Sequence, residues 1–161
     1  MAISKIGGTG SDNWELISSV TPTAASAAVN FTGLSTYRKL MVVWYDLVLG
    51  SSGTVSLRLN NDSGSKYMAA TSGGTGKIAT EISASSRTTG QNGFATFIDC
   101  DTASTKSIAA GQYASFTGST PVGSGYALQG IYLASASITR VNLITSTTFT
   151  AVGTVALYGV K

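Results

Sequence analysis

Apolar and polar residues alternate with a period of two along most of this chain, and Gly, Ser and Asn separate the alternating segments. In GTVSLRLN, residues 53 to 60, we expect Val55, Leu57 and Leu59 to face inward and the polar residues between them to face outward, because successive side chains of a strand point to opposite faces. Similar strand-like segments span residues 14–20, 40–49, 53–60, 77–83, 93–100, 107–116, 126–134, 138–145 and 149–160.

Two of these segments carry more specific predictions. WELISSV places Trp14, Leu16 and Val20 on one face of the first strand. LMVVWYDLVL is apolar on both faces except at Asp46, which predicts a central strand. No segment has a helical period.

A series of about nine or ten such strands, separated by turns, indicates an all-β sandwich or barrel, and we predict an antiparallel two-sheet sandwich. We expect its core to contain Leu40, Val42, Trp44, Val55, Leu57, Leu59, Ile131, Leu133, Val155 and Leu157.

Composition favours the same fold class. The 161 residues fit one domain and include 45 Ser and Thr, 19 Gly and 2 Pro, with only 11% charged residues. Helical domains normally carry more Glu, Lys, Arg and Leu. We therefore predict a single β domain over residues 14–161, preceded by a flexible N-terminal arm over residues 1–13.

Charge, cysteine content and the lack of long apolar runs limit the kinds of partner that we expect for this chain. The net charge of +3 is the excess of ten cations over seven anions, and the cations are scattered along the chain, so we expect no nucleic-acid partner. Cys100 is the single cysteine and lies between Asp99 and Asp101, which indicates a buried or inert thiol. No apolar run approaches the roughly 18 residues of a membrane span, and MAISKIGGTG lacks an apolar signal core. We expect a soluble protein that is synthesised in the cytoplasm and has no membrane partner.

The stretch NNDSG, residues 60 to 64, offers the nearest approach to a cation loop. Calcium needs about 6 to 8 oxygen ligands, and this loop has one carboxylate, Asp62, and no bidentate Glu. Asn, Asp and Gly also tolerate the positive φ angles of tight turns. We predict a turn here and no metal site.

Catalytic signatures are weak. GGTGK, residues 73 to 77, lacks the first glycine and the final Ser or Thr of a phosphate loop. The chain has no histidine, so imidazole-based mechanisms are excluded. Asp99 and Asp101 are the closest acidic pair, and we interpret them as solvated. We predict no enzyme activity, no catalytic residue and no cofactor. The seven tyrosines suit a protein interface or sugar stacking, or simply the filling of the sandwich.

Both ends of the β domain resemble a known module. WELISSVTPTAASAAVNFTGLSTYRKLMVVWYDLV with VSLRLNND, and the ending FTAVGTVALYGVK, are similar to a β-sandwich module of tailed-bacteriophage virion proteins. In that module a Trp-x-Leu-Ile strand precedes a Thr/Ala/Ser-rich stretch, a Phe-Thr-Gly-Leu turn and a central strand that Tyr opens. The resemblance implies a jelly-roll-like, frequently trimeric structural protein of the virion, and it points to no catalytic residue.

The resemblance leaves two functions open. In the first, the chain is a capsid decoration or cement protein on the outer capsid surface, which binds the major capsid protein and copies of itself as a homotrimer. In the second, it is a tail-fibre or tail-tip domain that recognises a host glycan. The first strand begins only a dozen residues after Met1, whereas fibre tips hang from long shafts, so we favour decoration. We expect Ile3, Lys5 and Ile6 of the N-terminal arm to bind the partner.

Overall fold

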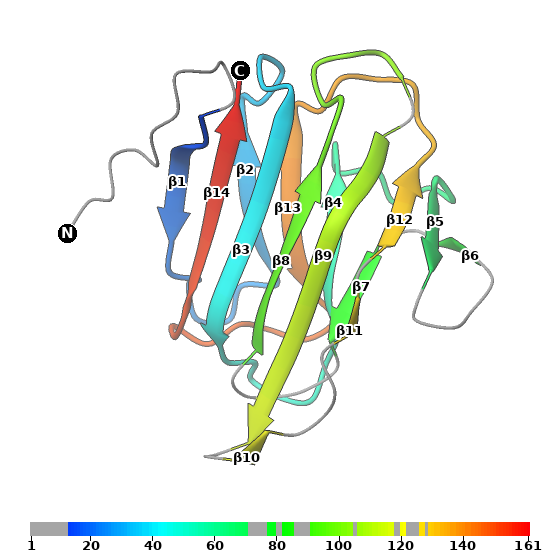
Figure 1. Cartoon of the computed structure of the whole chain (residues 1–161). Coiled ribbons are helices and arrows are strands. Elements are labelled where there is room, and N and C mark those ends of the chain that lie inside the picture. The colour runs from blue at the N-terminus through cyan, green and yellow to red at the C-terminus, as the bar shows by residue number, and fades with distance from the viewer. Residues whose placement is uncertain are drawn as a thin grey trace.

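The structure of the chain, a computed structural model, describes residues 13–70, 77–79, 82–85, 91–104, 106–117, 120–121, 126–127 and 129–161. In these ranges the chain forms strands, turns and bends (Figure 1). Within them we find no helix that could cross a membrane.

Eight strands form two facing antiparallel sheets. The larger sheet begins in the order β1-β14-β3-β8, and the smaller has the order β2-β13-β4-β7. The eight strands are β1 (Glu15–Val20), β2 (Ala28–Thr32), β3 (Lys39–Leu47), β4 (Val55–Leu59), β7 (Ile82–Ser85), β8 (Gln91–Phe97), β13 (Arg140–Thr145) and β14 (Thr154–Val160). This order, in which the chain crosses between the sheets, is the paired Greek key of a jelly roll. The predicted jelly-roll-like sandwich is confirmed.

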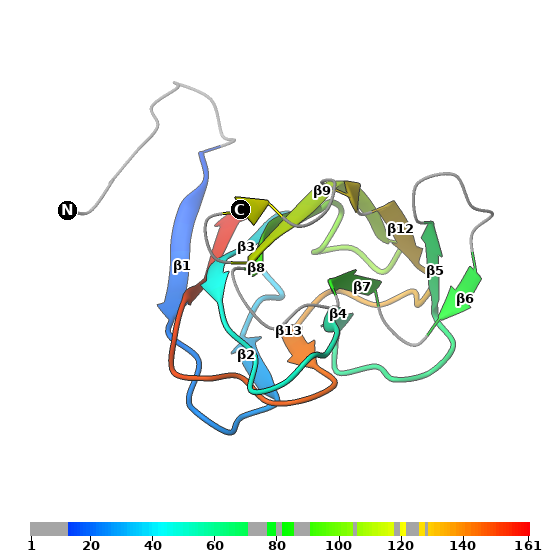
Figure 2. The ribbon, with the colours of Figure 1, turned by 90° about the horizontal axis from the view of Figure 1, so that it is seen from below.

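The remaining strands are two insertions that widen the larger sheet. One lies between β4 and β7 and holds β5 (Tyr67–Ala70) and β6 (Lys77–Ala79). The other lies between β8 and β13 and holds β9 (Lys106–Thr117), β10 (Thr120–Pro121), β11 (Tyr126–Ala127) and β12 (Gln129–Tyr132). The larger sheet continues as β9-β12-β5-β6, so it extends past the four strands that face it (Figure 2).

The core lies between the two sheets. In β3, Leu40, Val42 and Trp44 are buried and the residues between them are half-buried or exposed. In the facing sheet, β4 and β13 contribute a second set of buried residues. Leu57 and Leu143 belong to it and pair in register. Eight of the ten expected core residues are buried: Leu40, Val42, Trp44, Val55, Leu57, Leu59, Val155 and Leu157.

The other two expected core residues were assigned to the wrong face. Ile131 and Leu133 are 36% and 39% exposed. The inward residue of this segment is Tyr132, whose ring lies 4.9 Å from that of Tyr67 and whose hydroxyl donates to Asp62 Oδ2. Both alternating sets are apolar here, so alternation alone does not choose between them.

Strand boundaries differ from the prediction in several places. The segment 77–83 is divided between β6 and β7, and 126–134 between β11 and β12. The segment 93–100 ends its strand at Phe97, and 149–160 begins its strand at Thr154. Strands β2 and β5 were not predicted, because AVNFT and YMAA are too short to establish an alternation.

Candidate binding surfaces

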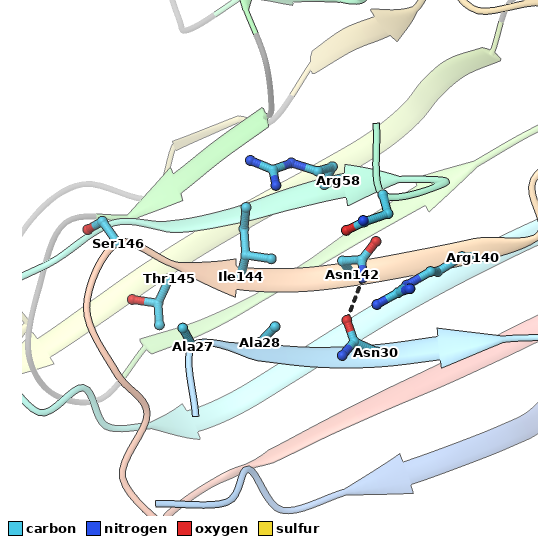
Figure 3. Close-up of a pocket in the computed structure, with 10 residues that line it drawn as sticks. Ala27, Ala28, Asn30, Arg58, Arg140, Asn142, Ile144, Thr145 and Ser146 are labelled. Atoms are coloured by element: carbon cyan, nitrogen blue, oxygen red, sulfur yellow. Dashed lines mark hydrogen bonds between the residues drawn. The ribbon is translucent and has the colours of Figure 1, made fainter. Parts of the chain in front are cut away.

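A polar pocket lies on the outer face of the smaller sheet. Strand β13 is in its centre and pairs with β2 on one side and β4 on the other. The register sets Asn142 opposite Asn30 and opposite Arg58, so the three side chains form a row across the sheet (Figure 3). Arg140 lies two residues before Asn142 and therefore projects from the same face.

The pocket has a volume of about 470 Å³, within the range of about 300 to 1,000 Å³ that small-molecule sites occupy. Its lining consists of Ala27, Ala28, Asn30, Arg58, Asn61, Arg140, Asn142, Ile144, Thr145 and Ser146. None of these ten residues is acidic, so the pocket is electropositive through two guanidinium groups.

Asn142 forms the floor of this pocket and is only 1% exposed. Its Nδ2 donates to Asn30 Oδ1, while its Oδ1 is buried and has no hydrogen-bond partner. The Nε of Arg140 is likewise buried and without a partner. Buried polar atoms are normally paired, so these two atoms mark a place where a ligand can supply both an acceptor and a donor.

A second surface is apolar and lies on the opposite side of the sandwich, on the outer face of the larger sheet. Leu16 of β1 pairs with Tyr158 of β14, which pairs with Met41 of β3. Leu16 is 55% exposed, while Tyr158 and Met41 are half-buried. We call this surface the β1 patch; its members are Leu16, Met41, Val43, Tyr45, Phe94, Ala156 and Tyr158.

A smaller apolar patch lies near the other end of the same sheet. Ile131 of β12 pairs with Met68 of β5, and Leu133 follows on the same face. All three are among the exposed large apolar residues. We call Met68, Ile131 and Leu133 the β12 patch.

The predicted turn at residues 60 to 64 is confirmed. Asn60 and Asn61 have φ angles of 53° and 55°, and the N–H of Asp62 donates to the carbonyl of Leu59 at 2.9 Å. Two successive positive φ angles are those of a type I′ turn. Asp62 is engaged within the fold, because its Oδ1 accepts from the N–H of Gly64 and its Oδ2 accepts from Tyr132. Burial, and then the hydrogen bond to Asp62, raises the pKa of Tyr132 well above its ordinary value.

Some of the other residues named in the sequence analysis lie in the described part of the structure, and some do not. Ile3, Lys5 and Ile6 lie outside the described residues, as does GGTGK except for Lys77. Cys100 is fully buried, and Asp99 and Asp101 are exposed in the turn after β8, as expected. Across the described ranges, no group of three or more His, Cys, Asp or Glu side chains could hold a metal ion.

The alternation in β13 already indicates part of the pocket from the sequence. Arg140, Asn142 and Ile144 alternate with the buried Val141 and Leu143, so they had to share the outward face of one strand. Arg58 was predicted to point outward from its own strand, but sequence alone does not show that the two strands are neighbours.

Comparison with known proteins gave no family assignment. No protein-family model, no curated protein and no solved structure matches this chain. The polar pocket, the β1 patch and the β12 patch are therefore the features that bear on function.

Proposed function

We propose that the chain is a non-enzymatic structural protein of a tailed-bacteriophage particle, a capsid decoration protein that binds the major capsid protein and copies of itself as a homotrimer. The observation that supports this proposal is the pair of apolar patches on the outer face of the larger sheet. The jelly-roll fold and the resemblance of both ends of the domain to virion modules agree with it.

Two different patches on one face suit a ring of copies. In a head-to-tail contact, one surface of a copy meets a different surface of the next, and the ring closes when the rotation allows. The β1 patch of one copy against the β12 patch of the next is such a contact. The members of both patches are uncharged, so their own burial in this contact takes no ionised group out of water.

The size of the apolar groups makes this contact favourable. Leu16, Tyr45, Ile131 and Leu133 each leave a third or more of their surface in water. Burying apolar surface stabilises an interface by roughly 25 cal/mol per Å². An exposed apolar surface of several large residues commonly marks a protein interaction site.

Capsid binding tests the proposal directly. The purified chain is added to capsids of the encoding phage that lack it, and occupancy is measured by quantitative electrophoresis after sedimentation. We expect binding to saturate when each binding site on the capsid holds three copies of the chain. A version lacking residues 2 to 10 tests the predicted arm, and we expect its occupancy to fall. Failure of the full chain to sediment with capsids would contradict the capsid assignment.

A second function is favoured by the polar pocket. A pocket with two arginines and unsatisfied amide and guanidinium atoms suits recognition of a soluble or surface-borne ligand, as a tail-fibre or tail-tip domain would need for a host glycan. Binding of the chain to host cells or polysaccharide, without binding to capsids, would assign it to the tail.

A further inference from the structure

The pocket on the smaller sheet has chemistry that a structural role does not require. Asn142 is almost completely buried, yet its Oδ1 has no donor, and leaving a buried polar atom unpaired destabilises a fold. A fold without a ligand here would be more stable with an apolar residue at this position. The side chain is nevertheless aimed into a cavity that is open to ligand.

The charges of the pocket call for an anionic group. Arg58 and Arg140 come from neighbouring strands and line a pocket that has no carboxylate; Arg140 extends toward Asn142 and Asn30, and Arg58 extends toward Ile144 (Figure 3). Guanidinium groups bind carboxylates and phosphates with paired hydrogen bonds. The unpartnered Nε of Arg140 is a donor already placed for such a group.

The other groups of the pocket distinguish among anions. Asn142 Oδ1 needs a donor, which sulfate lacks and a sugar hydroxyl has; inorganic phosphate keeps a hydroxyl at neutral pH but has no apolar face. Ala27, Ala28 and Ile144 add an apolar wall, which suits the C–H face of a sugar ring. An extended peptide is a poorer match, because peptides are commonly recognised along a free sheet edge and this pocket is centred on β13, between two paired strands.

We propose that this pocket binds an acidic sugar, with the carboxylate held by Arg140, a ring hydroxyl donating to Asn142 Oδ1, and Arg58 donating to the sugar from the Ile144 end of the pocket. The site is on the opposite sheet from the two apolar patches, so a ring of copies leaves it accessible. This inference goes beyond the proposed structural role and does not depend on it.

The test compares two sugars that differ only in the anionic group. Methyl glucuronide and methyl glucoside are titrated into isotope-labelled protein, and the NMR signals of the Asn142 side-chain amide and the Arg140 Nε–H are followed. We expect methyl glucuronide to saturate these signals with a dissociation constant of about 1 mM, and methyl glucoside to bind at least about tenfold more weakly. Inorganic phosphate and a pentaglutamate peptide are titrated as alternative anions and should bind more weakly than the glucuronide.

Variants assign the binding to the pocket. Arg140→Ala and, separately, Arg58→Ala should each weaken glucuronide binding about tenfold or more, because a charge-assisted hydrogen bond is lost. Lys66→Ala removes the same charge from an exposed loop outside the pocket and should leave binding unchanged. The NMR spectrum of each variant shows whether it is folded, and two independent arginines keep the test valid if one variant is not.

Several results would overturn the proposal. They are the absence of any shift with glucuronide up to about 20 mM, equal binding of the two sugars, and phosphate or pentaglutamate binding at least as tightly as glucuronide. An equal effect of Lys66→Ala and Arg140→Ala would also refute it, since binding would then follow net charge alone.

Discussion

At the scale of single residues, the positions with unusual backbone are those where strand pairing is interrupted. Asp46, the polar exception in an otherwise apolar strand, has a φ of 53° at a bulge in β3, and its N–H donates to Asn92 Oδ1 at 2.7 Å. The sequence identified Asp46 as an exception, but not the bulge, because the bulge depends on the partner strand. Gly153, with a φ of 88°, lies against this bulge, and nothing in its sequence neighbourhood marked it.

Gly153→Ala should therefore be strongly destabilising. A Cβ at this position would lie 2.5 Å from the carbonyl oxygen of Asp46, in addition to the strain of a positive φ. We expect a loss of about 2 to 4 kcal/mol in the free energy of unfolding, measured with urea. Gly33→Ala is the matched control. Gly33 also has a positive φ, of 74°, but no other atom would lie within 4 Å of a Cβ added at this position. It should cost only about 1 to 2 kcal/mol, and equal losses for the two variants would contradict the crowding at Gly153.

Tyr132 should make stability depend on alkaline pH. Its pKa is raised in the folded state, whereas in the unfolded chain it ionises near 10.0. Its contribution is therefore complete below about pH 10 and is lost as the pH rises above that value.

The comparison variant is Tyr132→Phe, which cannot ionise. The wild type should be more stable than this variant at neutral pH by about 1 to 3 kcal/mol, because the hydrogen bond to Asp62 is lost. That difference should shrink by about 1 kcal/mol between about pH 10 and about pH 11. A difference between wild type and variant that stays constant up to about pH 11 would contradict the raised pKa of Tyr132.

At the scale of elements, alternation predicted strands well where one face is apolar and the other polar. Strands β4 and β13 are such cases, and both were predicted nearly in full. Alternation was less informative in strands where both faces are apolar. In β1 a bulge separates Leu16 from Ser18, so Ile17 packs against the core while Leu16 points to solvent. Leu16 of β1 and Ile131 of β12 therefore remain exposed to solvent.

The two apolar patches should drive self-association of the purified chain. Leu16→Glu should disrupt the β1 patch, and Ile131→Glu should disrupt the β12 patch, so each variant alone should sediment as a monomer where the wild type forms a trimer. Val152→Glu is a control at a loop residue that is 49% exposed, close to the 55% of Leu16, and it should associate like the wild type.

Mixing the variants distinguishes a ring from a two-fold contact. The Leu16→Glu protein retains a β12 patch and the Ile131→Glu protein retains a β1 patch, so a head-to-tail contact predicts a one-to-one dimer in the mixture. If both patches met their own kind, the mixture would contain no such mixed dimer. A wild type that is monomeric at every concentration would contradict the predicted self-association of the purified chain.

At the scale of the whole molecule, the jelly roll presents two outer faces with different chemistry. The outer face of the larger sheet has two apolar patches suited to protein contact, and the smaller sheet has a cationic pocket suited to a ligand. The fold class was predictable because alternation and turn residues are local. The strand order and the pocket were not predictable, because they depend on which distant strands become neighbours. Arg58 and Asn142, for example, are 84 positions apart in the sequence and pair in register.

A three-dimensional reconstruction of the phage particle that contains this chain tests the central claim most directly. The account predicts the chain in clusters of three around symmetry axes on the outer surface of the capsid. Within each cluster the β1 patch of one copy should contact the β12 patch of the next, and the pocket of the smaller sheet should remain open. Single copies away from symmetry axes, with Leu16 and Ile131 exposed to solvent, would contradict the account.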